Sequence, residues 1–242
     1  MPEYTVIIQC RLSSKRLPNK ILLKIGNKTF LEFLINRLKK IEGLKIICAI
    51  AKEKGNSKLK RLLRNIKIDF FEGPEKNVLK RYYMAAKFYK CKNIIRITSD
   101  CPLIDHRLIE KGIKIFKSKR LDYLSNNLLQ TFPHGLDFEI FNYKSLKKAY
   151  KEGNSFSEIE HVTEYIKKNK GVKKFNLKSK IILNKYYRWT LDTKKDLIFF
   201  RKLYKEYLIK NNNVEWKRIY NFLKKRNDIS KINSSTHHFY FN

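Results

Sequence analysis

Short apolar segments alternate with amphipathic segments along the first half of the chain, and this alternation restricts the fold more than any other feature. The apolar segments occupy residues 6–8, 44–51, 66–71 and 93–98. The amphipathic segments occupy residues 30–43, 57–66, 77–89 and 105–116. Thr29 and Glu32 form a capping-box pattern at the first of these helices. Apolar strands that alternate with helices predict an α/β fold with a doubly wound, mostly parallel sheet.

The second half of the chain is less regular and predicts an α+β arrangement. We expect a strand over 136–141, a helix over 155–168 and two strands within 172–190. Amphipathic helices are predicted over 194–210 and 215–226. The chain shows no internal repeat and no low-complexity linker, so we expect one domain over residues 1–232. A C-terminal tail follows over 233–242, and its Phe239, Tyr240 and Phe241 are candidates to dock on the domain or on a partner.

The formal net charge of +33, from 55 Lys and Arg against 22 Asp and Glu, raises the possibility of nucleic-acid binding. However, the lysines are spread over almost every predicted helix, and no recognised nucleic-acid module is present. A basic nucleic-acid-binding protein therefore stays as the weaker alternative, and we expect no specific nucleic-acid partner. No apolar run approaches the roughly 18 residues of a membrane helix. Neither a signal-peptide pattern nor a disulfide or metal spacing of the four cysteines is present, which predicts a cytoplasmic protein with reduced, buried thiols.

A basic loop follows the first predicted strand directly, where ligands bind in open α/β sheets. It carries four cations and two hydroxyls: Arg11, Ser13, Ser14, Lys15, Arg16 and Lys20. Arginine binds phosphate oxygens in a bidentate fork, and lysine acts as a point charge. The loop has neither the Gly-Lys-Ser/Thr of a P-loop nor the glycines of a dinucleotide fingerprint. A polyphosphate site is the favoured interpretation, and an exposed, solvated basic loop is the alternative.

Two further segments place carboxylates after predicted strands. Residues 96–102, which read Arg-Ile-Thr-Ser-Asp-Cys-Pro, put Asp100 at the end of the fourth strand. Mg²⁺ at a phosphate site is usually held by one or two carboxylates, so Asp100 is a candidate magnesium ligand. Residues 188–193, which read Arg-Trp-Thr-Leu-Asp-Thr, put Asp192 just before a predicted helix. From the residues alone, Asp192 is as well explained as a helix N-cap.

The basic loop resembles the opening motif of the cytidylyltransferases that include the CMP-sugar-acid synthetases and the spore-coat-polysaccharide type. That motif reads Gln-Ala-Arg-Met-Gly-Ser-Thr-Arg-Leu-Pro-Gly-Lys, and residues 9–20 match it with Ser13 and Asn19 in place of two glycines. Residues 96–105 and 188–193 resemble two further blocks of this family. Additional matches cover residues 77–83, which lack two aspartates of the usual block, 131–139 and 157–163.

The resemblance implies roles for individual residues. Asp100 and Asp192 would hold Mg²⁺, and Arg11, Lys20 and Asp100 would be catalytic. The nucleotide would contact Gln9, Arg11, Ser13, Ser14, Lys15, Arg16, Lys20, Arg81, Arg96 and Thr98. The acceptor would contact His134, Asp137, Glu139, Glu160, His161 and Arg188.

The resemblance therefore implies a Mg²⁺-dependent nucleotidyltransferase with the fold of nucleotide-diphospho-sugar transferases. We expect it to join CTP, or another NTP, to a small anionic or sugar-derived acceptor for surface polysaccharide or glycoconjugate synthesis. A glycosyltransferase of the same fold is the rival enzyme, although Asp100-Cys101-Pro102 stands where such enzymes typically carry Asp-x-Asp. The half around 131–190 is expected to form the acceptor pocket and a homodimer contact. The apolar residues offered for that contact are Phe132, Phe138, Ile140, Phe141, Ile181, Ile182 and Leu183.

Overall fold

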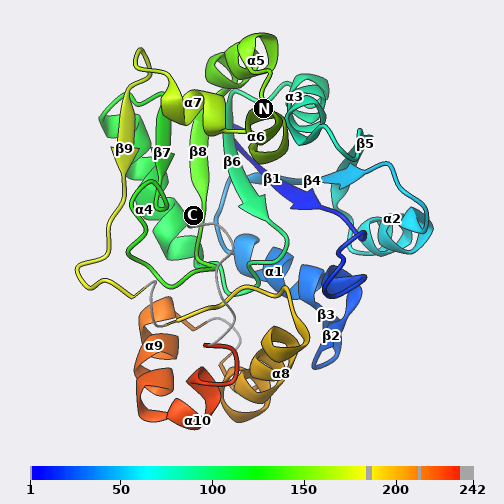
Figure 1. The fold of residues 1–242 in the computed structure, drawn as a ribbon, viewed down its shortest axis with the longest axis vertical. Coiled ribbons are helices and arrows are strands. Elements are labelled where there is room, and N and C mark those ends of the chain that lie inside the picture. Colours follow the sequence, from blue (N-terminus) through cyan, green and yellow to red (C-terminus); the bar gives the residue numbers. More distant parts are fainter. Residues whose placement is uncertain (1, 184–186, 212–213, 235–242) are drawn as a thin grey trace.

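The computed structural model describes residues 2–183, 187–211 and 214–234, which build an α/β sheet protein (Figure 1). The predicted docking of Phe239, Tyr240 and Phe241 lies outside the described residues. The central sheet has seven strands in the order β5-β4-β1-β6-β8-β7-β9. Its strands are β1 Tyr4–Cys10, β4 Lys45–Ala51, β5 Asp69–Gly73, β6 Asn93–Thr98, β7 Tyr123–Ser125, β8 Glu139–Asn142 and β9 Lys174–Asn176. A hairpin of β2 Lys24–Ile25 and β3 Lys28–Thr29 stands apart from it.

The first four strands of this sheet confirm the predicted parallel arrangement. β1 pairs in parallel with both β4 and β6, and β4 pairs in parallel with β5. The chain therefore winds outward from β1 to β5 and then crosses back to β6 on the other side of β1. The gap beyond the carboxyl ends of β1 and β6 is the point at which ligands bind in sheets of this type.

The other three strands make the sheet mixed. β8 runs antiparallel to β6 and β7, and β9 runs parallel to β7. The predicted strand over 136–141 is confirmed but shifted, because β8 begins at Glu139. Of the two strands predicted within 172–190, the structure contains only β9, together with one isolated bridge between His134 and Arg188 among the described residues.

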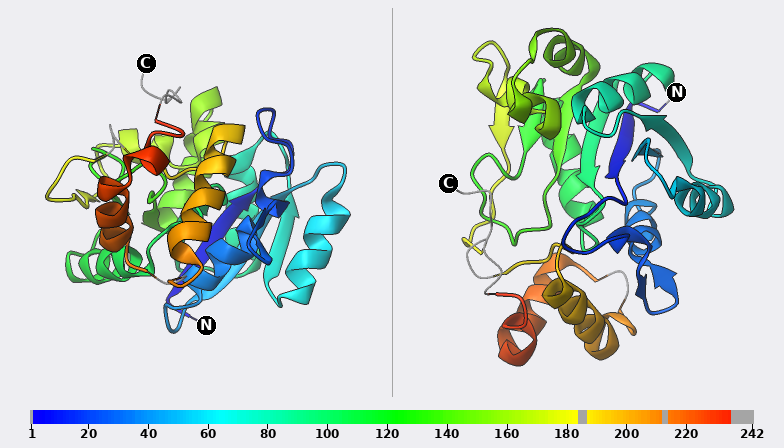
Figure 2. Two further views of the ribbon diagram at one scale, coloured as in Figure 1. Left: turned by 90° about the horizontal axis from the view of Figure 1, so that it is seen from below. Right: turned by 45° about the vertical axis from the view of Figure 1, so that its right-hand side comes forward.

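Helices cover both faces of the sheet, as a doubly wound fold requires (Figure 2). The helices are α1 Phe30–Leu38, α2 Asn56–Asn65, α3 Val78–Phe88, α4 His106–Ser118, α5 Tyr143–Glu152, α6 Phe156–His161, α7 Glu164–Lys168, α8 Lys194–Leu203, α9 Trp216–Lys225 and α10 Asn227–Ser230. Short helical turns over Lys20–Leu22 and Tyr204–Leu208 complete the set. Alternate residues of β1 enter different clusters: Val6 and Ile8 pack with α1 and α4, and Ile7 packs with α3 and α5.

Helix starts follow the sequence signals closely. Thr29 and Glu32 form the predicted capping box of α1. Asp105 caps α4 and accepts a hydrogen bond from the amide of Arg107, as expected for an aspartate at that position. The predicted end of α1 near Gly43 is wrong, since the helix stops at Leu38. The last three helices, α8 to α10, gather at one end of the molecule, where Phe200 packs edge-on against Phe30 of α1 (Figure 1).

The helix predicted over 155–168 is interrupted. The structure has α6 and α7 instead, separated at Val162, whose φ of 59° is left-handed. A β-branched residue rarely adopts that conformation, so the surrounding packing must impose it. Val162 is fully buried beside α3 and α5, and this burial supplies the compensating contact. The interruption turns α6 and α7 so that side chains from both helices face the same pocket.

The dimer contact predicted from the sequence is wrong for most of its residues. Phe132, Phe138, Ile140, Phe141 and Leu183 are all buried in the cores of this chain, with at most 3% exposure. Phe138 and Ile140 pack against Gly112 of α4, and Phe132 packs edge-on against Trp216 of α9. Only Ile181 and Ile182 of that set are exposed, at 56% and 60%.

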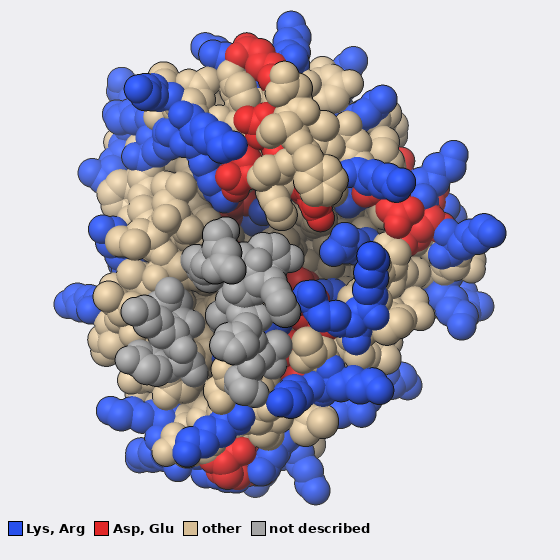
Figure 3. All heavy atoms as spheres, in the orientation of Figure 1, with Lys and Arg blue, Asp and Glu red and all other residues tan. Residues whose placement is uncertain are grey.

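Surface charge and the cysteines agree with the sequence. Lys and Arg side chains surround the face shown in Figure 3 without forming one stripe. All four cysteines are free and buried. Among the described residues, no helix combines the length and the apolar character needed to cross a bilayer.

Gly135 lets the segment before β8 approach the segment before α8. Its φ of 108° is left-handed, and a Cβ there would overlap the backbone carbonyl of Trp189. Two hydrogen bonds hold these segments together: the amide of Trp189 donates to His134 (2.6 Å), and the amide of His134 donates to Tyr187 (3.0 Å). Glycine is required here by both conformation and space.

We expect Gly135→Ala to lower the free energy of unfolding by about 4 kcal/mol or more, because it adds a backbone overlap to left-handed strain. Gly43→Ala is the matched control, since Gly43 has φ 71° with open space around its Cβ position. It is expected to cost about 1–2 kcal/mol through strain alone. Urea unfolding measures both. Equal losses in the two variants would show that the approach of the two segments is not tight.

Candidate active site

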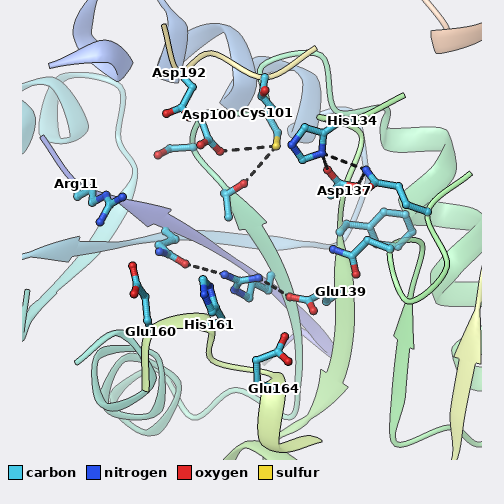
Figure 4. A pocket seen from close by; sticks show the side chains of 18 of the residues that line it. Arg11, Asp100, Cys101, His134, Asp137, Glu139, Glu160, His161, Glu164 and Asp192 are labelled. Carbon is cyan, nitrogen blue, oxygen red and sulfur yellow. Dashed lines mark hydrogen bonds and ion pairs between the residues drawn. The ribbon is translucent and has the colours of Figure 1, made fainter. Parts of the chain in front are cut away.

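An open pocket of about 730 Å³ lies beyond the carboxyl ends of β1 and β6 (Figure 4). Its volume is in the range of small-molecule sites. The lining comes from the basic loop, β6, β8, the segment before β8, both short helices α6 and α7, and the segment before α8. The polar lining residues are Gln9, Arg11, Arg16, Lys20, Arg96, Thr98, Ser99, Asp100, Asn127, Gln130, His134, Asp137, Glu139, Ser157, Glu160, His161, Glu164, Lys167, Arg188, Thr190 and Asp192.

Lys20 joins the two predicted metal carboxylates. Its Nζ lies 3.0 Å from Oδ2 of Asp100 and 2.8 Å from Oδ1 of Asp192, although these residues are 80 and 172 positions away in sequence. Burial opposes the charge of Lys20, but the two carboxylates outweigh it and raise the pKa of the ammonium group. Burial likewise opposes ionisation of Asp100 and Asp192, but the charge of Lys20 together with hydrogen bonds to each carboxylate outweighs it and lowers the pKa of both carboxyl groups. All three groups are therefore charged at neutral pH.

Asp192 is not a helix cap. The N-cap of α8 is Thr193, whose hydroxyl accepts from the amide of Asp196, while the Asp196 carboxylate accepts from the amide of Thr193. The Asp192 side chain instead pairs with Arg16 and Lys20. The structure thus answers the question that the sequence left open, and leaves the carboxylate of Asp192 directed at the pocket.

Asp100 and Asp192 have the chemistry of a cation site. Both are ionised, and both already converge on one ammonium group. Among the described residues, no group of three or more His, Cys, Asp or Glu side chains is arranged as a metal cluster. Two carboxylates suit Mg²⁺ at a phosphate site, where phosphate oxygens and water complete the coordination.

Hydrogen bonds from outside the pocket hold the basic loop in place. The amides of Leu12 and Ser13 donate to the Glu53 carboxylate at 2.6 and 3.0 Å. The Ser13 hydroxyl donates to Glu75 at 2.9 Å, a bond that glycine cannot make. Asn19, at the second replaced glycine, adopts φ 55°, which asparagine tolerates better than most residues. Both replacements are therefore compatible with a loop that presents its cations inward.

Four predicted nucleotide contacts lie outside the pocket lining. Ser13, Ser14 and Lys15 do not line the pocket. Arg81 is fully buried, and its guanidinium donates to the backbone carbonyl of Glu75 (3.1 Å) and to that of Pro74. It fixes the turn before α3, which is a structural role. A sequence block does not reveal which face of a helix reaches the ligand.

The floor of the pocket is a buried ionic network. Arg96 donates to Glu139 at 2.5 Å and to the side chain of Gln9 at 3.0 Å. Glu139 also accepts from the hydroxyls of Tyr123 and Thr163, both at 2.6 Å. Burial works against ionisation of Glu139, but the charges of Arg96 and Lys167 together with the hydroxyl hydrogen bonds outweigh it and lower its pKa to about 2. Glu139 lines the pocket as predicted, but its oxygens already organise the floor.

The remaining predicted acceptor residues line the pocket on several sides, and Arg188 lies only 3.7 Å from Asp192. His134 and Asp137 lie side by side, with Nδ1 and Oδ2 3.2 Å apart, and the amide group of Gln130 contacts both. Glu160 and His161 enter from α6, and Figure 4 shows them across the pocket from Asp100 and Asp192. Arg188 is held by Asp196, which is fully buried and accepts from its guanidinium at 3.0 and 3.2 Å.

Sequence reasoning missed several lining residues. Lys167 lies 2.9 Å from Glu164 and 3.4 Å from Glu139, which places a cation in the acceptor half. Asn127 and Gln130 come from a segment without a motif, and their positions had no local signal. Thr190 had a local signal: it alternates with Arg188 and Asp192, which are both predicted site residues.

A mostly parallel sheet with a cation-rich loop after β1, and two carboxylates that meet beyond β1 and β6, is typical of a nucleotide-processing enzyme of the α/β class. The chain belongs to the cytidylyltransferase family, because the family model matches residues 5–224. It is accordingly a nucleotidyltransferase, and its family membership confirms the resemblance found in the sequence.

Two relatives extend over nearly the whole chain. The uncharacterized protein MJ1063 of Methanocaldococcus jannaschii is 38% identical over 232 residues, which cover 95% of this chain and 93% of the relative. The spore coat polysaccharide biosynthesis protein SpsF of Bacillus subtilis is 26% identical over 214 residues, which cover 85% and 88%.

Solved structures agree with the observed fold. A cytidylyltransferase from Leptospira borgpetersenii superposes with a TM-score of 0.89 at 28% identity, covering 98% of this chain and 100% of that one. CMP:2-keto-3-deoxy-manno-octonic acid synthetase in complex with CTP reaches 0.65 at 14% identity, over 84% and 99% of the two chains. The second likeness concerns the fold alone.

Glu139→Gln is expected to lower the free energy of unfolding at pH 7 by about 3–5 kcal/mol, because it leaves the buried guanidinium of Arg96 without its counter-charge. The folded pKa of Glu139, about 2, lies below its ordinary 4.5. Its contribution is therefore fully present above pH 4.5 and is lost as the pH falls toward 2. The difference between wild type and variant is expected to shrink over that window.

Urea unfolding of both proteins at pH 7 and pH 3 measures this difference. Glu152→Gln is the control, because the Glu152 side chain is half exposed, and we expect a change of about 0.5 kcal/mol or less. A Glu139→Gln variant as stable as wild type at pH 7 would contradict the role assigned to the floor network.

Proposed function

We propose that this protein transfers a cytidylyl group from CTP to a small acceptor and releases pyrophosphate. The proposal rests on one observation: Lys20 contacts both Asp100 and Asp192 beyond β1 and β6, in a chain of the cytidylyltransferase family. An acceptor oxygen attacks the α-phosphorus, the bond between the α-phosphorus and the bridging oxygen breaks, and pyrophosphate carries away that electron pair. Positioning and charge neutralisation supply most of the rate in such transfers.

The basic loop is proposed to bind the triphosphate. Arg11 is exposed at the pocket and faces its interior in Figure 4, while Arg16 and Lys20 already face the carboxylate pair. Their charges offset those of the phosphates and of departing pyrophosphate. Asp100 and Asp192 would hold Mg²⁺, which when bound neutralises phosphate charge and orients the phosphate oxygens.

The acceptor is proposed to be a small anionic or sugar-derived molecule. Asp137 with His134, on the side of the pocket near Asp100, and Glu160 with His161, across the pocket from it, present hydrogen-bonding groups suited to hydroxyls. The name of the Bacillus subtilis relative supports a place in surface polysaccharide synthesis. Four free, buried cysteines support the proposed cytoplasmic location, where thiols stay reduced.

A homodimer is proposed through an apolar patch beside β9, the last strand of the sheet. The patch consists of Leu128, Leu129, Ile181 and Ile182, which are 40–60% exposed. Asn176 of β9 ties the first pair to the sheet by side-chain bonds to the backbone of Leu129, at 3.2 and 3.0 Å. A second copy of the chain would cover both the patch and the free strand edge.

Purified protein is expected to release pyrophosphate from CTP and Mg²⁺ with at least one acceptor from a panel of sugar acids, phosphonates and sugar phosphates. Asp100→Asn and Asp192→Asn are each expected to reduce kcat by about 10²–10³ or more, because each removes a preorganised charge from the reacting phosphates. Each variant leaves Lys20 one carboxylate partner, so both are expected to stay folded.

The assay compares four NTPs, with circular dichroism as the folding control. Asp228→Asn is the matched surface control, since Asp228 pairs with Lys202 and Arg226 far from the pocket, and it is expected to retain wild-type kcat. Absence of pyrophosphate release with every NTP and acceptor argues against the proposal. Sugar transfer from a nucleotide sugar would favour the rival glycosyltransferase activity.

Light scattering is expected to give twice the chain mass at micromolar concentration. Ile182→Lys is expected to shift the protein to a monomer, because it places a charge within the apolar patch. Ile209→Lys is the control: Ile209 is 57% exposed but follows the helical turn Tyr204–Leu208, outside the patch. A wild-type monomer, or a dimer that survives Ile182→Lys unchanged, contradicts the proposed contact.

A further inference from the structure

Thr190 is a pocket residue whose side chain has no partner in the part of the chain that the structure describes. Its residue is only 5% exposed, and its Oγ1 is buried without a hydrogen bond. Thr190 nevertheless lines the pocket. Arg96 is the other pocket residue with such an atom, but the remaining nitrogens of its guanidinium are bound. Thr190 has one polar side-chain atom, and no described residue bonds it.

The backbone on either side of Thr190 is fixed. The amide of Trp189 donates to His134 at 2.6 Å, and the amide of Leu191 donates to the carbonyl of Asp100 at 2.8 Å. Trp189 and Leu191 are fully buried, while Arg188, Thr190 and Asp192 line the pocket. The backbone of Thr190 is therefore held in place, and the residue lines the pocket together with Asp192.

A buried hydroxyl without a hydrogen bond destabilises a protein, because it has lost water and gained no partner. An unsatisfied buried group in a pocket calls for an explanation, and a bound ion, water or ligand that completes its hydrogen bond supplies one. The two hydrogen-bonded peptides beside Thr190 join its segment to the backbones of His134 and Asp100. Asp192 lies two residues further along the same segment and lines the same pocket, so Thr190 belongs to the part of the pocket that carries both carboxylates.

We propose that the Thr190 hydroxyl accepts a hydrogen bond from a water molecule in the coordination shell of the ion held by Asp100 and Asp192. This inference rests on the proposed function. Alternate residues of an extended segment lie about 6.6 Å apart, which is too far for Thr190 to share a direct ligand position with Asp192 but suits contact through one water. Mg²⁺ keeps several waters, and groups that orient them tune metal affinity.

The experiment measures two dissociation constants by calorimetry: Mn²⁺–CTP, and CTP alone in EDTA. Thr190→Val keeps the shape of the side chain and removes the hydroxyl. It is expected to weaken Mn²⁺–CTP binding by about 10–100-fold, the usual effect of losing an outer contact to a metal site. CTP affinity in EDTA is expected to stay unchanged, and Thr190→Ser is expected to bind Mn²⁺–CTP like wild type.

Thermal unfolding without ligand separates this role from a structural one. Thr190→Val is expected to leave Tm unchanged or raised, since no bond is lost. Thr131→Val is the matched control: Thr131 is also 5% exposed, but its Oγ1 accepts from the amide of Ser179 at 2.8 Å, away from the pocket. That variant is expected to lower Tm and to leave Mn²⁺–CTP affinity unchanged.

Three results overturn the inference. If Thr190→Val binds Mn²⁺–CTP as tightly as wild type, the hydroxyl makes no contact with the metal shell. If Thr190→Val weakens the binding of Mn²⁺–CTP and of CTP in EDTA equally, the hydroxyl contacts the nucleotide and not the metal shell. If Thr190→Val lowers Tm, the hydroxyl makes a structural hydrogen bond. A wild-type protein that binds neither Mn²⁺–CTP nor CTP is a different failure, because it contradicts the proposed function itself.

Discussion

The ion pairs of Lys20 with Asp100 and Asp192 connect the three parts of the chain that make the site. Lys20 follows β1, Asp100 follows β6, and Asp192 precedes α8, so these pairs fasten the two halves of the fold across the pocket. Without Lys20, the two carboxylates would repel each other, and burial would destabilise their ionised forms. A cation between them keeps both ionised, and it holds them ready for a second cation that arrives with phosphate groups.

Charge in the pocket differs from charge over the chain. Although the protein carries 55 basic and 22 acidic residues, the pocket lining has equal numbers of each. Most of its cations are paired with carboxylates, as Arg96 is with Glu139 and Arg188 with Asp196. Such pairs fix side chains in position and leave little net field at the floor. The net charge of the chain therefore says little about the ligand, whereas the arrangement of pairs at the β1–β6 edge says much.

Helix breaks and close backbone approaches shape the acceptor half. Val162 interrupts what the sequence pattern presents as one helix, and Gly135 lets the segment before β8 touch the segment that carries Thr190. Both depend on contacts with residues distant in sequence. The same holds for the strands beyond β6: β7 and β9 are three residues long, too short to leave a clear alternating pattern.

The sequence by itself determined the parallel half of the sheet, the starts of α1 and α4, and the cation loop and carboxylates of the site. These features follow from local periodicity, capping residues and position after a strand, which are properties of neighbouring residues. Only the tertiary structure decided that Arg81 supports a turn, that Glu139 is committed to the floor, and that Thr193 rather than Asp192 caps α8. Those outcomes depend on which partner each side chain meets across the fold, and charge pairing and burial between distant residues leave no trace in local sequence.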